Sequence, residues 1–274
     1  MTSIRTYLAG ATLLPLMLGL APMTQTSAAQ AQTITDAADS ARNMAMAEKP
    51  GPDAPDADAL AALDKMGVAL RNLKFVSVRG DVTTEQVLIS GQKIQFAGTL
   101  DITAIRPDKL KMVIKSDHQE RVIYYDGKAV TVFAPARGYY ASAPAPATIG
   151  EALKTAKTKY DFELPLADLF LWGTDPTLTA RVKSGFDAGP ETINGVAVEH
   201  YVFRQENVDW QVWISGAGLP LKLVITSTDD SSQPQYSSVL TWNTDVAPDA
   251  GSFAFVPPAD AHRIALTEVA DGSK

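Results

Sequence analysis

Apolar and polar residues alternate over most of the chain after Phe75, and turn-forming residues separate the alternating runs. Alternation with a period of two places successive side chains on opposite faces of a β-strand. Three of the separating turns are Ser90-Gly91, Asp126-Gly127 and Asn194-Gly195. Pairs of this kind favour tight hairpins, because the central residues of such turns need positive φ angles. The pattern therefore predicts a mainly β protein of the α+β class, with a largely antiparallel sheet of about ten strands.

Before the strands, apolar residues recur at helical spacing, and Asp58 stands just ahead of them. We expect one amphipathic helix with Asp58 as its N-cap, and its apolar stripe must pack on another layer. The residues of the stripe are Leu60, Leu63, Met66, Leu70 and Leu73.

Two further helical segments interrupt the strands. Thr148 and Glu151 form a capping box at the start of "TIGEALKTAKTKY". In "LPLADLFLWG", Pro165 suits a first helical turn and Gly173 suits a stop, with Asp168 as the one charged residue between them. A short helix that is apolar nearly all round either belongs to the core or faces an apolar cavity.

The predicted sheet is broad and its helices are few. A sheet of so many strands curls, closes or splits. Two or three helices can cover the concave face of a curled sheet and leave an apolar hollow between the layers. A ligand, if the protein binds one, would occupy that hollow.

One charged residue breaks the alternation, in "LDITAIRPDKLKMVI" (Leu100–Ile114). Arg106 falls on the same strand face as five apolar residues, Ile94, Phe96, Leu100, Ile102 and Ala104. Either the strand has ended, so that the guanidinium turns to solvent, or the charge lies at the rim of the hollow. At the rim it would bond helix C-terminal carbonyls or a lid segment and meet the polar head of a ligand.

The first residues have the three parts of a secretory signal peptide. Arg5 supplies a basic start, Tyr7 to Ala21 is mostly apolar, and Ala29 to Ala31 offers a small-x-small cleavage site. A membrane anchor needs roughly 20 apolar residues, whereas this run is shorter and contains Pro15. We therefore expect an exported, periplasmic protein that is soluble after removal of the signal peptide.

The expected organisation has four parts. Residues 1–31 are the signal peptide, and residues 32–57, which include "EKPGPDAPDAD", are predicted to be a disordered linker. A single half-barrel domain is expected over 58–266, followed by a tail over 267–274. The mature chain is long enough to form one large β domain.

Charge and composition narrow the range of expected binding partners. The 24 basic and 31 acidic residues give a net charge of −7, which becomes −8 without Arg5. An acidic surface disfavours nucleic acid and anionic lipid headgroups. The absence of cysteine excludes disulfides, a thiolate nucleophile and sulfur-ligated metals.

The common catalytic sequence patterns are absent. His118, His200 and His262 are far apart in the sequence, and no nucleophile, zinc-protease, phosphate-binding or dinucleotide motif is present. His118 fits a solvated turn, and His200, on the face of three valines, fits a satisfied core or lining histidine better than a ligand. We expect no enzyme, no cofactor and no metal.

Three segments, in order, resemble the periplasmic carrier of outer-membrane lipoproteins. They are "IRPDKLKM" (Ile105–Met112), "YYDGKAVTVFAP" (Tyr124–Pro135) and "FAFVPPADAHRI" (Phe253–Ile264). Together with "GAGLPLKLVI" and "FLWG" they are even more similar to an uncharacterised family of predicted periplasmic proteins assigned to the same fold. The likeness spans roughly Leu60 to Ile264.

This resemblance implies an unclosed β-barrel whose concave face is covered by helices around a cavity for acyl chains. It also implies that Arg106 matches the arginine that helps to hold that cavity closed. We expect a binding or carrier protein for a lipid, lipoprotein acyl chains or another amphiphile, with a membrane-associated donor or acceptor protein as a further partner. The alternative is an interaction or sensor module of the same fold without a transported ligand. The expected ligand-binding residues are Phe96, Leu100, Ile102, Arg106, Met112, Tyr124, Leu169, Phe170, Trp172 and Trp210.

Overall fold

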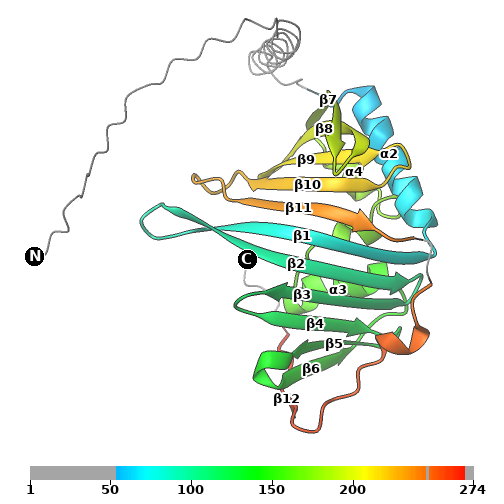
Figure 1. Cartoon of the computed structure of the whole chain (residues 1–274), viewed down its shortest axis with the longest axis vertical. Helices are drawn as coiled ribbons and strands as arrows, with labels where there is room; N and C mark the ends of the chain where they lie inside the picture. The colour runs from blue at the N-terminus through cyan, green and yellow to red at the C-terminus, as the bar shows by residue number, and fades with distance from the viewer. Residues whose placement is uncertain (1–53, 245–246, 269–274) are drawn as a thin grey trace, which may run out of the picture. The chain divides into compact units, whose positions relative to one another are not determined.

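Twelve strands form one sheet in the computed structural model, which describes residues 54–244 and 247–268 (Figure 1). The strands are β1 (Phe75–Val87), β2 (Lys93–Ile105), β3 (Lys109–Ser116), β4 (Glu120–Tyr125), β5 (Ala129–Ala134), β6 (Tyr139–Pro144), β7 (Ser184–Ile193), β8 (Val196–Gln205), β9 (Val208–Ser215), β10 (Pro220–Ser227), β11 (Gln235–Trp242) and β12 (His262–Arg263). Their order across the sheet is β12-β6-β5-β4-β3-β2-β1-β11-β10-β9-β8-β7.

The curled, unclosed sheet predicted from the sequence is confirmed. β12 and β7 are its two edges, so within the described residues the sheet does not close into a barrel. Neighbouring strands are antiparallel except β12, which pairs in parallel with β6. The strand count exceeds the predicted ten partly because β12 has two residues, too few to show alternation.

Two α-helices pack as the sequence predicts, with one change at a cap. Helix α2 (Ala57–Asn72) begins after Asp56, and Asp58 lies in its first turn instead of capping it. Helix α3 (Ile149–Tyr160) has the predicted capping box, in which the Thr148 hydroxyl accepts from the Glu151 amide at 3.3 Å and donates to Glu151 Oε2 at 2.8 Å. A one-turn helix, α4, spans Thr177–Ala180.

The expected helix in "LPLADLFLWG" is wrong in extent. Only a four-residue 3-10 helix, η2 (Ala167–Phe170), forms there, and turns follow it up to Gly173. Leu166 has φ +57°, a left-handed conformation that a continuous α-helix does not contain. Two other 3-10 helices are η1 (Pro135–Arg137) and η3 (Ala250–Phe253).

The core lies between the inner face of the sheet and the helices (Figure 1). Alternate residues of the central strands, such as Leu100, Ile102 and Met112, pack against the apolar stripe of α2, including Leu63 and Met66. These side chains are at most 1% exposed. Each such burial stabilises the fold by about 1.5–3 kcal/mol before the entropy cost of ordering the chain.

The segment after β11 crosses the outer face of the sheet and reaches its edge. Phe255 packs on Tyr124, Phe133 and Tyr140, with ring centroids 5.0–5.3 Å apart. β12 then pairs with β6, and beyond it Glu268 forms an ion pair of 2.7 Å with Lys159 of α3.

All described residues belong to one compact unit, Gly51–Lys274. The predicted signal peptide, 1–31, lies outside the described residues, as do positions 32–53 of the predicted linker and 269–274 of the predicted tail. The last linker residues are part of the fold, because the Asp56 amide donates to the Gly185 carbonyl of β7 at 2.9 Å.

Candidate functional site

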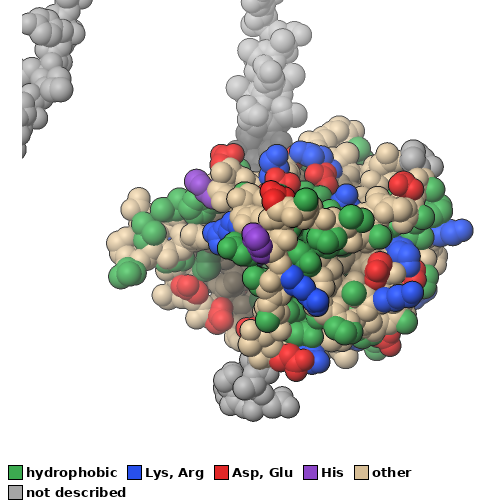
Figure 2. Space-filling model, turned by 90° about the horizontal axis from the view of Figure 1, so that it is seen from below, with side chains coloured by type: hydrophobic (Ala, Val, Ile, Leu, Met, Phe, Trp, Pro, Cys, Tyr) green, Lys and Arg blue, Asp and Glu red, His purple; other side chains and the backbone are tan. Residues whose placement is uncertain are grey.

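Two neighbouring pockets open on the inner face of the sheet, and both are bordered by Pro165 and Tyr236. The first has a volume of about 440 Å³ and the second about 400 Å³. The first lies where the β1–β2 hairpin leaves its neighbours, since β11 pairs with β1 only as far as Thr84 and β3 pairs with β2 only from Gly98. Figure 2, seen from below, shows the surface hollowed beside the projecting part at the left.

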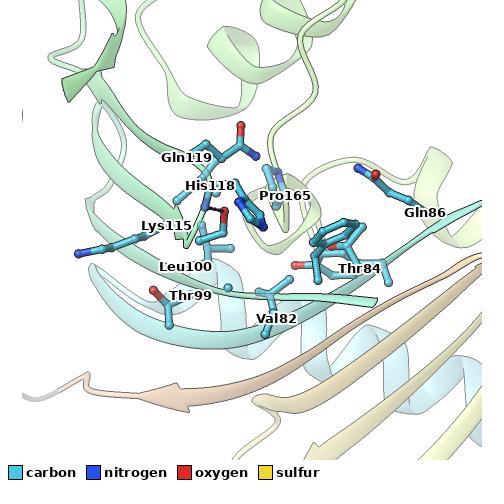
Figure 3. A pocket seen from close by; sticks show the side chains of 15 residues that line it. Val82, Thr84, Gln86, Thr99, Leu100, Lys115, His118, Gln119 and Pro165 are labelled. Atoms are coloured by element: carbon cyan, nitrogen blue, oxygen red, sulfur yellow. Dashed lines mark hydrogen bonds between the residues drawn. The ribbon is translucent and has the colours of Figure 1, made fainter. Parts of the chain in front are cut away.

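The first pocket has an apolar floor and a polar rim. Val82 and Leu100 lie on the strands that form the floor, and Pro165 enters from the loop opposite, close to His118 (Figure 3). The remaining lining residues include the apolar Phe96 and Ile114 and the polar Thr84, Gln86, Lys115, Ser116 and Gln119. An apolar cavity with few polar groups at its mouth suits a molecule with an apolar chain and a polar end.

Gly98 lines the first pocket. This residue pairs with Val82 of β1 and Ser116 of β3, all on the inner face. A Cβ at position 98 would lie 2.8 Å from the Lys115 carbonyl oxygen, closer than atoms pack. Glycine avoids this contact and adds no side chain to the pocket lining.

The second pocket lies between α3, the segment 162–171 and the inner face of β10 and β11. Leu153, Phe162, Leu164 and Ile225 supply apolar lining, whereas Lys154, Lys157 and Asp168 lie among them as charges. Asp168 lines this pocket and is exposed to solvent. Burial raises the pKa of Asp168, and the nearby Lys157 partly opposes that effect.

Arg106 directs its guanidinium into the fold and not to solvent. Nη2 donates to the Leu70 carbonyl at 3.2 Å and to the Leu169 carbonyl at 3.5 Å, and the guanidinium lies 5.3 Å from the centre of the Phe170 ring. Leu70 is in the last turn of α2 and Leu169 is in η2. A helix leaves its last four carbonyls without intrahelical partners, so a buried cation there satisfies them.

The surroundings of Arg106 hold it half-buried. Burial lowers the pKa of its guanidinium, and Nε has no hydrogen-bond partner within the described residues. Arg106 follows β2 directly, whereas Phe96 marks the pocket ten residues earlier, roughly 30 Å along an extended strand. The arginine therefore links α2 and η2 to the end of β2 that is far from the first pocket. It lines neither of the two pockets.

Two of the other nine predicted ligand-binding residues, Phe96 and Leu100, line one of the two inner-face pockets. Six are buried in the core and fill the space that was expected to be hollow: Ile102, Met112, Leu169, Phe170, Trp172 and Trp210. The rings of Trp172 and Trp210 pack against each other, with centroids 5.7 Å apart. Tyr124 lies on the outer face of the sheet, against Phe255.

Several lining residues are absent from the sequence prediction, chiefly Val82, Thr84, Ile114, Pro165 and Tyr236. Val82 and Thr84 share the strand parity of the buried Val76 and Val78. That parity alone would have placed them on the inner face. Tyr236 joins them only through the pairing of β11 with β1, two strands that are about 150 residues apart in the chain.

The histidines do not form a metal site. Within the described residues there is no group of three or more His, Cys, Asp or Glu side chains that could hold a metal ion. His200 has partners on both ring nitrogens, Glu191 at 2.9 Å and Gln211 at 3.0 Å, and it stacks on Trp213. Also in this part of the chain, no helix has the length and apolar character needed to cross a membrane.

Comparison with solved structures gives similar chains at low identity. The lipoprotein LppX of Mycobacterium tuberculosis is 16% identical with a TM-score of 0.47, covering 71% of this chain and 100% of LppX. LprF of Mycobacterium bovis is 14% identical with a TM-score of 0.41, covering 76% and 100%. A LolA superfamily protein of Nitrosomonas europaea is 11% identical with a TM-score of 0.34, covering 72% and 97%.

Comparison at the level of sequence families is more decisive. A search of the curated proteins gave no match. One family model, described as predicted periplasmic protein (DUF2092), matches residues 59–267, which is most of the chain. The chain therefore belongs to this family of predicted periplasmic proteins, in agreement with the location expected from its sequence.

Proposed function

We propose that this protein is a periplasmic carrier that holds the apolar part of an amphiphile, such as a lipid or the acyl chains of a lipoprotein, in the two pockets of its concave face. The observation that supports this most directly is the unfilled space of about 440 Å³ above Val82, Leu100 and Gly98, bordered by polar residues at its mouth. The neighbouring pocket of about 400 Å³ extends that space beyond Pro165.

The energetics of such binding are favourable without any chemical step. Burying an acyl chain gains about 0.8 kcal/mol per methylene group. A chain of a dozen methylenes would therefore gain on the order of 10 kcal/mol before ordering costs. Release would then depend on an acceptor that competes for the ligand, on a membrane or on a membrane-associated protein. This account requires no catalytic residue and no cofactor.

Arg106 has a supporting role in this proposal. Its bonds to Leu70 and Leu169 hold α2 and η2 together at the far end of the sheet. The 3-10 helix η2 follows directly on the segment that carries Pro165, the residue that borders both pockets. Loosening the Arg106 contacts would free that segment to move away from the sheet, which would widen the pockets during uptake or release.

The test is to purify the mature protein without detergent, extract it with organic solvent and identify bound molecules by mass spectrometry, and in parallel to titrate it with a fluorescent fatty acid. We expect a near-stoichiometric lipid or saturable binding of the probe. Thr84→Trp, which places a large ring in the first pocket, should weaken probe binding at least tenfold. Thr83→Trp is the matched control, because the adjacent residue points to the outer face.

Two results would contradict the proposal. Protein that carries no lipid and binds no apolar probe would favour the interaction module, in which the core side chains leave too little room for a ligand. Equal loss of binding in Thr84→Trp and Thr83→Trp would show that the probe does not occupy the first pocket.

A further inference from the structure

The inner face of the sheet contains hydrogen-bond donors that have no acceptor. Four buried side-chain atoms in the described residues lack a hydrogen-bond partner: Arg106 Nε, Trp210 Nε1, Tyr236 Oη and Ser238 Oγ. The guanidinium and indole nitrogens can only donate, and the two hydroxyls can also donate. The interior is thus short of acceptors, and a buried donor without a partner costs about 1–3 kcal/mol.

Two of these atoms lie beside the pockets. Tyr236 and Ser238 are two residues apart on β11, so both point to the inner face. Tyr236 pairs with Thr84 and Ser238 pairs with Val82, and both partners line the first pocket. Tyr236 itself borders both pockets, at the point where Pro165 separates them.

The two hydroxyls share one environment. Ser238 is fully buried, with an exposed fraction of 0%, and Tyr236 is largely enclosed. Burial raises the pKa of Tyr236 to about 12, and an interaction with the Ser238 hydroxyl, which lies close by without meeting hydrogen-bond geometry, opposes part of that increase. Both hydroxyls are therefore neutral and able to donate over the ordinary pH range. Apolar side chains surround the pair, since Leu223 of β10 is in register with Ser238 and Ile225 with Tyr236.

We infer that the hydroxyls of Tyr236 and Ser238, in the wall of the apolar pockets, recognise a carbonyl oxygen carried within the ligand's apolar part. A carbonyl oxygen has two lone pairs, so it can accept from both hydroxyls at once. The ligand class is then a lipid with an ester or keto group along or between its chains, not a plain hydrocarbon chain. This inference rests on the proposed function, because it specifies a ligand for the same pockets.

The test compares matched C18 acids in competition with a dansyl-labelled undecanoic acid. One is octadecanoate, and the others are oxo-octadecanoates with the keto group at carbon 6, 10 or 12. We expect at least one oxo acid to bind wild-type protein five- to tenfold more tightly than octadecanoate, since one hydrogen bond to a neutral donor supports a gain of that size. In Tyr236→Phe/Ser238→Ala this preference should vanish, so that the oxo acids and octadecanoate bind with equal affinity.

Two controls separate recognition from a structural role. Tyr139→Phe removes a hydroxyl from a tyrosine that is 46% exposed, and it should leave the preference intact. The double variant Tyr236→Phe/Ser238→Ala should keep or raise the melting temperature, because it removes two buried hydroxyls that lack a hydrogen-bond partner in the part of the chain that the structure describes. If all four acids bind wild-type protein equally, or if the preference survives in the double variant, the inference is overturned and the proposed carrier function stands. If no acid displaces the probe and none binds, the inference and the proposed carrier function are both contradicted.

Discussion

At the scale of single residues, Arg106 changes meaning between sequence and structure. In the sequence it is a charge on an apolar strand face. In the fold its guanidinium donates hydrogen bonds to carbonyl groups of two helices, Leu70 in α2 and Leu169 in η2. We predict that Arg106→Leu lowers the free energy of unfolding by about 1–3 kcal/mol, because both carbonyls lose their donor. Burying the guanidinium costs desolvation energy that offsets part of its favourable contacts. The loss of stability in Arg106→Leu is therefore limited to this range. Urea unfolding followed by circular dichroism measures the change.

The matched control is Arg79→Leu. Arg79 forms an exposed ion pair with Asp101 at 3.1 Å on the outer face, and such pairs contribute at most about 1 kcal/mol. Arg106→Lys should fall between the two, because a lysine ammonium lacks the planar fork that reaches two carbonyls. Equal destabilisation in Arg106→Leu and Arg79→Leu would contradict the assigned role.

At the scale of elements, helix α2 meets the turn after η2 through two glycines. A Cβ on Gly67 would lie 2.8 Å from the Gly173 amide nitrogen, and Gly173 has φ +77°. We predict that Gly67→Ala destabilises the protein by about 1–3 kcal/mol through overpacking, although alanine is the better helix former by about 1 kcal/mol. Thermal and urea unfolding would show whether alanine is less stable than glycine at this helical position, the reverse of their helix propensities.

Gly150 of α3 provides the comparison for this substitution. A Cβ there would lie 3.6 Å from Leu171 Cδ2, an ordinary contact. Gly150→Ala should therefore be neutral or stabilising by up to about 1 kcal/mol. A stabilising Gly67→Ala would mean that α2 and the turn can separate without cost.

At the scale of the whole molecule, buried tyrosines make the fold sensitive to alkali. Burial raises the pKa of Tyr125 and of Tyr236 to about 12, above the unfolded value near 10. A raised folded-state pKa of a tyrosine favours the neutral form, so the associated stability is fully present below pH 10 and is lost as the pH rises through 12. For Tyr236 the loss is on the order of 2 kcal/mol.

The measurement is the urea midpoint of wild-type protein and Tyr236→Phe at pH 8, 10 and 11.5. The variant should lose less stability between pH 10 and 11.5, because its aromatic ring cannot ionise, while lysine deprotonation affects both proteins alike. Identical pH profiles would show that the Tyr236 hydroxyl titrates as freely in the folded state as in the unfolded chain.

Much of the fold follows from local pattern, since period-two alternation, turn pairs and the Thr148 capping box depend on neighbours in the sequence. The sequence by itself determined the strands, the amphipathic helix α2, the curled sheet and the exported, periplasmic character that the family assignment supports. Parity also placed Leu100 and Phe96 on the inner face, where they line the first pocket. It could not show which inner-face residues face empty space.

Tertiary structure decided where the hollow is and what borders it. Trp172 and Trp210 pack against each other in the core, whereas the space near Phe96 remains open, because packing depends on how residues distant in the chain fit together. Tyr236 reaches the pockets through the register of β11 with β1, and Tyr124 faces outward through the parity of β4. Pairing register and side-chain volume are properties of contacts between elements, and no single segment encodes them.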